Sequence, residues 1–184
     1  MASVFDTIKM KAGDTDRSNN WYRGQVNRIA SGTTARELFR QGKLARRPSV
    51  GRLNLFGYNP KLRKTLPYYD VFPLVLPLEA ISGGFIGMNF HYLPPLLRTR
   101  LLERMQATAT DKNFDRNTKF DVTYSDVKNL NIVKPTIKKY LYSYVQTGFL
   151  RINADEAATA IYLPVQRFKK ASEARVYADS RRFI

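Results

Sequence analysis

Cysteine is absent from the 184 residues, and histidine occurs once, at position 91. Without thiols the chain can form neither a disulfide nor a thiolate metal site, and it has no cysteine nucleophile. One histidine without cysteine leaves the usual zinc ligand sets unfilled. We therefore expect a protein that works without a bound cofactor or metal.

Long hydrophobic runs are missing as well. The longest apolar run, residues 71–78, is interrupted by Pro73 and Pro77. It is far shorter than the roughly 20 residues that a membrane-spanning helix requires. The first residues, MASVFDTIKMKAGD, also lack the continuous apolar core of a secretory signal. We expect no membrane partner.

Acidic residues are scarce relative to basic ones: 15 Asp and Glu stand against 31 Lys and Arg, for a formal net charge of +16. The excess is concentrated between residues 17 and 64. This segment contains twelve cationic residues and one acidic residue, Glu37, so it contributes +11 of the +16. Such an asymmetry indicates a polyanionic partner. The candidates are nucleic acid, an anionic membrane surface and an acidic protein, and of these we expect nucleic acid. The alternative interpretation is an ordinary solvated charged face.

Ten of these cations are the candidate nucleic-acid-binding residues. Duplex DNA held through backbone charge is the simplest hypothesis, because phosphate contacts require no particular motif. Composition does not distinguish DNA from RNA, and no small-molecule substrate is expected. The candidates are Arg23, Arg28, Arg36, Arg40, Lys43, Arg46, Arg47, Lys61, Arg63 and Lys64.

The N-terminal segment predicts short helices. Residues 18–32 can be capped by Asn20 or Ser18, have one apolar face and end in a glycine. Residues 34–42 begin with Thr34 and Glu37 at capping-box spacing. Residues 43–49 are predicted to be a basic linker, in which Pro48 stops any helix. We predict a basic helical arm over residues 1–49 and a core domain over residues 50–184.

The sequence pattern of residues 50–184 predicts an α+β fold with a small antiparallel sheet surrounded by helices. Three strands at short spacing, near residues 50–58, 71–79 and 81–90, favour a meander in which Gly83 and Gly84 form a turn. A small SH3-like barrel would place Pro73 and Pro77 at edges or bulges. Helices are predicted at 93–106, 134–148 and 172–183, the last capped by Ser172, and a returning strand at 148–152.

Motifs for catalysis are weak. Asp70 and Glu79 bracket one strand, but no lysine follows Glu79 at the spacing of a common metal-dependent nuclease motif, and Asp121 with Asp126 is only a loose pair. A nuclease remains a minor alternative, since magnesium sites often use one or two carboxylates. SGGFIG lacks the Gly-Lys-Ser/Thr of a phosphate-binding loop. His91, with no nucleophile nearby, is predicted to be a core residue, and we expect no enzyme.

Tyrosines offer a second mode of nucleic-acid binding. Tyr68, Tyr69, Tyr140, Tyr142 and Tyr144 could present ring faces to bases. Aromatic residues at helical spacing more often pack in a core. We therefore predict core positions for Tyr140 and Tyr144, and less firmly for Tyr142.

Several longer stretches carry a resemblance to a known family. They are GRLNLFGYNPKLRKTLPYYDVFPLVLPLE, GGFIGMNFHYLPPLLRTRLLERM, VKPTIKKYLYSYVQTGFLRI and AIYLPVQRFKK. Over roughly residues 50–184 the chain resembles small basic proteins of T4-like tailed phages, cyanophages among them. This is the family of the DNA end protector, a head-completion protein. No active-site motif is carried over with the resemblance.

The resemblance implies a non-catalytic virion protein that shields packaged DNA ends from host exonuclease. It implies other virion proteins as partners, and a location in the virion and, during assembly, in the host cytoplasm. The N-terminal basic segment is expected to diverge from the family. The alternative is a structural component of the phage neck, tail or baseplate held by protein–protein contacts.

Overall fold

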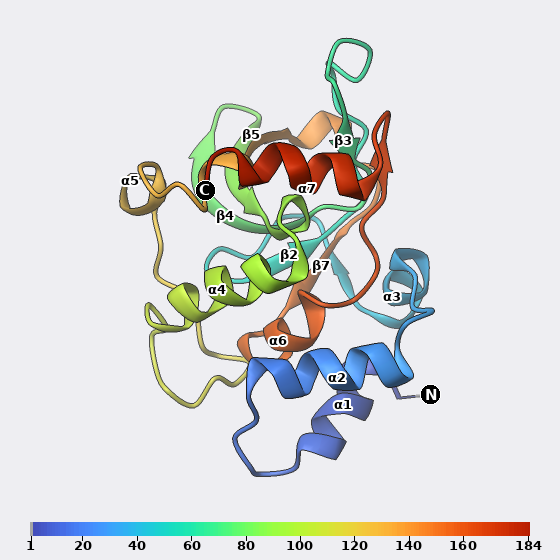
Figure 1. The fold of residues 1–184 in the computed structure, drawn as a ribbon, viewed down its shortest axis with the longest axis vertical. Coiled ribbons are helices and arrows are strands. Elements are labelled where there is room, and N and C mark those ends of the chain that lie inside the picture. Colours follow the sequence, from blue (N-terminus) through green and yellow to red (C-terminus); the bar gives the residue numbers. More distant parts are fainter. Residues whose placement is uncertain (1) are drawn as a thin grey trace.

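Six antiparallel strands form the main sheet in a computed structural model that describes residues 2–184 (Figure 1). Their order is β1-β7-β2-β4-β5-β6, and a separate pair, β3 with β8, lies beside them. The strands are β1 (Leu44–Ala45), β2 (Leu53–Leu55), β3 (Tyr69–Asp70), β4 (Leu74–Ile81), β5 (Gly84–Asn89), β6 (Ile137–Leu141), β7 (Phe149–Ile152) and β8 (Phe168–Lys169).

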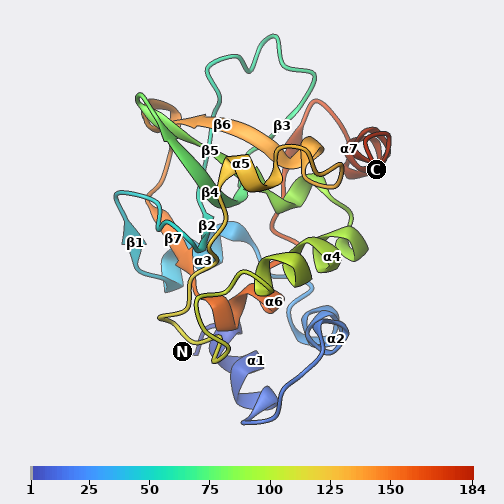
Figure 2. The same cartoon turned by 90° about the vertical axis from the view of Figure 1, so that its left-hand side faces the viewer.

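Helices surround this sheet, which confirms the predicted α+β class (Figures 1 and 2). The α-helices are α1 (Val4–Ala12), α2 (Asn19–Ile29), α3 (Ala35–Gln41), α4 (Pro95–Gln106), α5 (Tyr124–Val127), α6 (Ala157–Ala160) and α7 (Glu173–Arg181). The 3₁₀ turns are η1 (Phe90–Tyr92), η2 (Lys134–Thr136), η3 (Tyr142–Tyr144) and η4 (Ala154–Glu156).

The predicted meander is present, since β2, β4 and β5 are neighbours in the sheet. The β4–β5 hairpin turns at Gly83, whose φ of 73° favours glycine. Gly84 must also lack a side chain, because a Cβ there would lie 1.9 Å from the carbonyl oxygen of Tyr140. Pro77 lies at the register shift of β4, in agreement with the predicted bulge position.

The two faces of the sheet bury different clusters. Leu53, Leu55, Leu76 and Met88 face the main core beneath the helices. A smaller aromatic cluster occupies the other face and consists of Phe56, Tyr58, Val75, Phe85, Tyr140 and Phe149.

The chain after β2 also bonds to the chain after β6. Asn59 donates its backbone N–H to the carbonyl of Tyr144, and Gln146 donates to that of Gly57. The sheet therefore curls over the aromatic cluster, as an SH3-like barrel would require.

The N-terminal segment is helical, as predicted, and its caps are among those predicted. Ser18 caps α2, and Thr34 with Glu37 forms a capping box on α3. The predicted boundary at residue 49 does not separate two cores, however. Phe5 and Leu38 belong to the main core cluster, and β1 pairs with β7. Residues 2–49 are thus packed onto the domain rather than extended from it.

The helix predicted at 134–148 is wrong. This segment is η2, followed by β6, which pairs with β5 along five residues, and then η3. Tyr140 on β6 belongs to the aromatic cluster, and Tyr142 at the start of η3 packs against it. Pairing with β5 therefore overrides the weak helical pattern.

Candidate nucleic-acid interface

All ten predicted cations lie on the surface: Arg23, Arg28, Arg36, Arg40, Lys43, Arg46, Arg47, Lys61, Arg63 and Lys64. Within residues 2–184 none of them belongs to an ion pair. Apart from Arg28, which donates to Gln25 at 2.6 Å, their side chains donate no hydrogen bond to the protein over that range. These charges contribute little to holding the fold and are available to phosphates.

The fold does not collect the ten cations into one patch. Arg23 and Arg28 lie on α2, at one end of the long axis of the molecule. Lys61, Arg63 and Lys64 lie in the loop of residues 60–66, which projects from the opposite end (Figures 1 and 2). Arg36 and Arg40 are on α3, and Lys43, Arg46 and Arg47 are on or beside the edge strand β1. The candidate cations are therefore distributed from one end of the molecule to the other.

Two cations of the same segment that were not candidates are held by the protein. Arg17 donates Nε–H to the carbonyl of Ala12 at 3.4 Å and lies over the Trp21 ring, 5.0 Å from its centroid. Arg52 donates to the carbonyl of Arg116 at 2.8 Å. Burial is the main reason that the pKa of Arg52 is lowered, with the nearby charge of Arg151 second.

Arg47 makes a specific contact beside the edge strand. Its guanidinium carbon lies 4.4 Å from the ring centroid of Tyr142, which is half-buried. A shallow depression of about 330 Å³ adjoins this pair and includes Leu44, Arg46 and Phe149 in its lining. An arginine held over a half-buried ring is pre-oriented for a planar anion or a base.

The side chain of Lys170 holds the loop of residues 60–66 through hydrogen bonds to its backbone. The Nζ of Lys170 donates to the carbonyls of Arg63 at 3.3 Å and Lys64 at 3.2 Å, and to that of Leu66. Lys170 itself has a φ of 72°, which is unusual for a residue with a side chain. One lysine thus fixes the backbone of a loop that carries three other cations.

His91 lies in a buried polar network, as predicted for a core histidine. Its Nδ1 lies 2.8 Å from Oδ2 of Asp70, which also accepts from Asn89 at 3.1 Å. Oδ1 of Asp70 accepts the backbone N–H of Phe72 and of Arg167, so both carboxylate oxygens are occupied. Burial lowers the pKa of His91, although the Asp70 carboxylate opposes that shift. Neither side chain can reach a substrate on the surface.

Arg98 extends this network from α4 and is 1% exposed. It donates to the carbonyls of Leu93 at 2.7 Å, Ile161 at 2.8 Å and His91 at 3.3 Å. It also donates to the Tyr177 hydroxyl at 2.8 Å. Burial lowers the pKa of Arg98. This arginine joins three helical segments and the η1 turn, and it takes no part in the basic surface.

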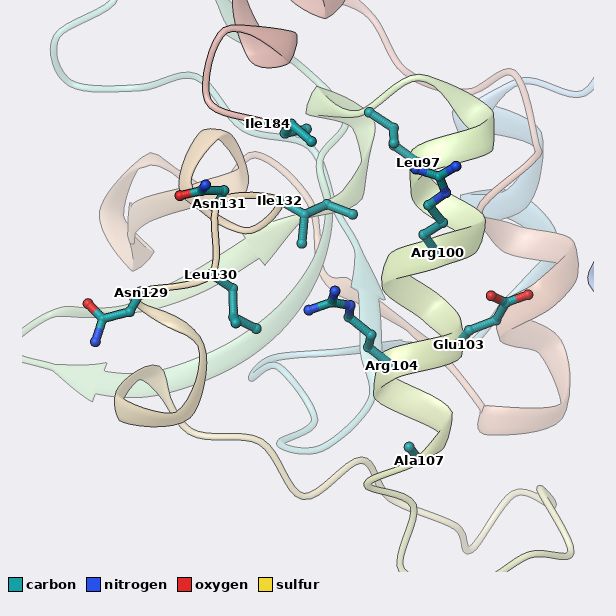
Figure 3. Close-up of a pocket in the computed structure, with 10 residues that line it drawn as sticks. All are labelled: Leu97, Arg100, Glu103, Arg104, Ala107, Asn129, Leu130, Asn131, Ile132 and Ile184. Atoms are coloured by element: carbon teal, nitrogen blue, oxygen red, sulfur yellow. The ribbon is translucent and has the colours of Figure 1, made fainter.

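An open groove of about 690 Å³ runs between α4 and the segment 129–132 (Figure 3). Leu97, Leu130 and Ile132 supply apolar walls, and the exposed Arg100 and Arg104 line it one helical turn apart. Sequence reasoning missed these two cations. The signal was their four-residue spacing in RTRLLER, which places both on one face of α4.

The tyrosines are mostly used inside the protein. Tyr140 is 4% exposed in the aromatic cluster, which confirms its predicted core position, and Tyr144 and Tyr142 are partly buried against that cluster. Tyr68 donates its hydroxyl to Asp179 at 3.2 Å and packs on Tyr92. Tyr142 has a candidate cation, Arg47, over its ring.

Carboxylates do not gather into a metal site over residues 2–184, where no group of three His, Asp or Glu side chains could hold an ion. Asp70 is engaged in the buried network, while Glu79 is exposed beyond the bulge of β4. Asp126 caps α5 through Thr123, which lowers its pKa. No helix in this part of the chain is long and apolar enough to cross a membrane.

Comparison with known families gives one match that covers nearly the whole chain. The model of the phage T4 terminal DNA protecting protein matches residues 5–183. The chain belongs to this family. The match includes the N-terminal basic segment, so the family resemblance extends well beyond the predicted 50–184. The curated proteins and the solved structures provide no match. Membership of the terminal DNA protecting family gives the basic surface a specific candidate ligand.

Proposed function

We propose that this protein binds the ends of duplex DNA and shields them from exonucleases by occupying them. The observation that carries the proposal is the set of ten exposed cations, none in an ion pair within the described residues, in a chain of the terminal DNA protecting family. Unpaired cations release counterions from phosphates when they bind, which drives association without sequence specificity. An end protector needs this property, because genome ends must be held whatever their sequence.

The wide distribution of the candidate cations supports occupancy of a DNA end through several phosphate contacts. Cations lie on α2, on α3, beside β1 and in the loop of residues 60–66. A duplex lying on such a surface contacts several phosphates at once. An exonuclease must thread or grip the terminus, and a bound protein of this size denies it that access.

A binding role without catalysis is part of the proposal. The one histidine is buried, both oxygens of the Asp70 carboxylate accept hydrogen bonds, and the described carboxylates form no metal cluster. We propose that the protein acts in the virion, that it is present in the host cytoplasm during assembly, and that other virion proteins are its partners.

Exonuclease digestion of linear duplex tests this function. At one or two protein copies per end, open-ended duplex should be preserved, and hairpin-closed duplex should compete poorly for the protein. The DNA should remain uncut in magnesium, and binding should survive chelation. Protection that begins only when protein saturates the DNA, or equal competition by closed ends, would leave only general polyanion binding. Cleavage in magnesium would contradict the non-catalytic role.

A structural role in the neck, tail or baseplate is the second candidate. The observation that favours it is the exposed edge strand β1, which carries Leu44 and is followed by Arg46 and Arg47. An unpaired strand edge can accept a strand from a partner, and flanking cations can fix its register against an acidic surface. An assembly experiment with these two arginines separates this candidate from the first.

A further inference from the structure

We infer that the loop of residues 60–66 recognises the DNA end itself, with Leu62 packed on the open face of the terminal base pair. Lys61, Arg63 and Lys64 would bind the phosphates beside it. This inference rests on the proposed function and adds to it the element that distinguishes an end from the interior of a duplex. Three features of the loop support it: its position, its composition and its rigidity.

The loop projects from one end of the molecule, clear of the helices (Figures 1 and 2). Leu62 is 59% exposed, although a leucine in this position gains nothing from contact with water. Three exposed cations lie within two residues of it. An apolar side chain ringed by positive charge matches a DNA end, where an apolar base-pair face is bordered by phosphates.

Other exposed apolar residues have less suitable surroundings. Met10 is 78% exposed, but its neighbour Lys9 is paired with Asp155. Val50 is 74% exposed, but Arg52 beside it is held by the carbonyl of Arg116. Leu44 lies beside Lys43 and Arg46, which also have no side-chain hydrogen bond or ion pair within the described residues, but it is only 37% exposed. Leu62 combines 59% exposure with three such cations within two residues.

The loop is also rigid before it meets a ligand. Arg63 donates its backbone N–H to Pro60 at 3.2 Å, and Thr65 and Leu66 donate theirs to the carbonyl of Leu62 at 3.0 and 2.9 Å. Lys170 Nζ also donates hydrogen bonds to three backbone carbonyls of the loop. A fixed loop loses little conformational entropy on binding, so Leu62 can be presented to a base pair without a folding step.

A DNA end differs from the interior of a duplex in exposing one face of its terminal base pair. Inside a duplex each base pair is stacked on both sides, and a side chain reaches that face only by unstacking the bases. At an open blunt end one face is already free. A hairpin closure covers it, so a hairpin-closed duplex of the same sequence presents the same phosphates without the apolar face.

The test compares Leu62→Ala with Leu96→Ala, which truncates another exposed leucine, 56% exposed on α4. The probe is blunt linear duplex, with hairpin-closed duplex as competitor. Leu62→Ala should lower the preference for open ends about tenfold, as the loss of one buried leucine contact implies, and leave the salt dependence unchanged. Leu96→Ala should behave as wild type. Equal unfolding midpoints show that both variants are folded.

A second pair of variants tests the rigidity of the loop. Lys170→Met removes the three carbonyl contacts, and Lys169→Met removes the same charge from the exposed neighbouring residue. We expect Lys170→Met to lower the open-end preference at least severalfold and Lys169→Met to leave it unchanged. Equal effects of the two would show that only charge matters and would overturn the role of the anchored loop.

The outcomes separate this inference from the proposed function. If wild-type protein protects ends and Leu62→Ala protects them equally well, the loop is not the end-recognition element, although end protection stands. If wild-type protein shows no preference for open ends, the proposed function fails first. If Leu62→Ala weakens open and closed duplex equally, Leu62 contributes to general binding and the inference is wrong.

Discussion

Nδ1 of His91 lies 2.8 Å from Oδ2 of Asp70, and both residues are almost fully buried. The imidazole Nδ1–H donates to the carboxylate, while Nε2 has no hydrogen-bond partner in the described part of the chain. Desolvation lowers the pKa of His91, against the opposing charge of Asp70, and the charges of Arg98 and Glu173 act more weakly in opposite directions. The folded protein therefore holds His91 neutral.

This arrangement predicts that His91 makes the stability of the folded protein depend on pH. Below a pH of about 6.5 the unfolded histidine takes up a proton that the folded one refuses, so the free energy of unfolding should fall as pH falls. The slope attributable to His91 is at most about 1.4 kcal/mol per pH unit. His91→Asn keeps a donor toward Asp70 and removes the titration. Denaturant unfolding of both proteins at pH 7, 6 and 5 checks this prediction, and parallel curves would contradict it.

The hydrogen bonds of buried Arg98 predict that replacing this residue lowers the free energy of unfolding substantially. Arg98→Met leaves three carbonyls and the Tyr177 hydroxyl without their donor, and buried polar groups left unpaired cost ~1–3 kcal/mol each. We expect a loss of roughly 3 kcal/mol or more in the free energy of unfolding. Arg100→Met, on the same helix but exposed, should change it by less than about 0.5 kcal/mol. Urea unfolding of both variants makes the comparison, and equal effects would exclude a structural role for the Arg98 network.

Helix ends were predictable because their signals are local. Ser18, Thr34 with Glu37 and Ser172 cap α2, α3 and α7 from within a few residues of each helix start. The sequence predicted the last two directly, and Ser18 as one of two possible caps with Asn20. The β4–β5 hairpin was likewise predictable from its glycine pair. In each case the residues that decide the structure are adjacent in sequence.

Features that depend on distant partners were missed. The strand β6 forms because β5, some fifty residues earlier in the chain, supplies its hydrogen bonds. Asp70, His91 and Arg98 meet only because β3, η1 and α4 converge. The charge excess of residues 17–64 was evident, but its division between opposite ends of the molecule follows from the packing of α2 and the long connection from β2 to β4.

Lys138 on β6 gives a prediction about chemical reactivity. Its Nζ lies 4.0 Å from the ring centroid of Tyr92, and burial lowers its pKa to about 8. At pH 7 the neutral amine fraction should be roughly two hundredfold larger than for an ordinary lysine with a pKa near 10.4. Limiting acetic anhydride should therefore modify Lys138 first, as read by peptide mass spectrometry. The exposed neighbour Lys139 is the internal control, and preferential modification of Lys139 would contradict the prediction.

Charge reversal at Arg46 and Arg47 distinguishes the two proposed functions. If these arginines contact an acidic virion protein, Arg46→Glu with Arg47→Glu should block particle assembly while leaving DNA affinity nearly unchanged. If they bind phosphates, the same variant should lose DNA affinity instead. Reversal of the exposed Lys112 and Lys128, outside the basic segment, controls for net charge. Normal particles formed by the Arg46 and Arg47 variant would count against the structural role.

The salt dependence of DNA binding tests where phosphates are contacted. With about five phosphates neutralised, log affinity against log salt should have a slope of roughly −4.5. Deleting the N-terminal segment would be a poor test, because Phe5, Ile8, Val26 and Leu38 would leave the core. Side-chain replacements avoid this problem, since the candidate cations are exposed and hold no ion pair within the described residues.

Two sets of glutamine substitutions compare the two ends of the molecule. Replacing Lys61, Arg63 and Lys64 should flatten the slope by roughly 2.7 if all three contact phosphates, since each contact contributes about 0.9. Replacing Arg23 and Arg28, at the other end of the long axis, should flatten it by less, because a duplex end held at the loop reaches α2 last. Fluorescence anisotropy of a labelled duplex between about 50 and 200 mM salt gives these slopes. A larger change in the α2 variant would move the primary DNA contact to α2, away from the loop.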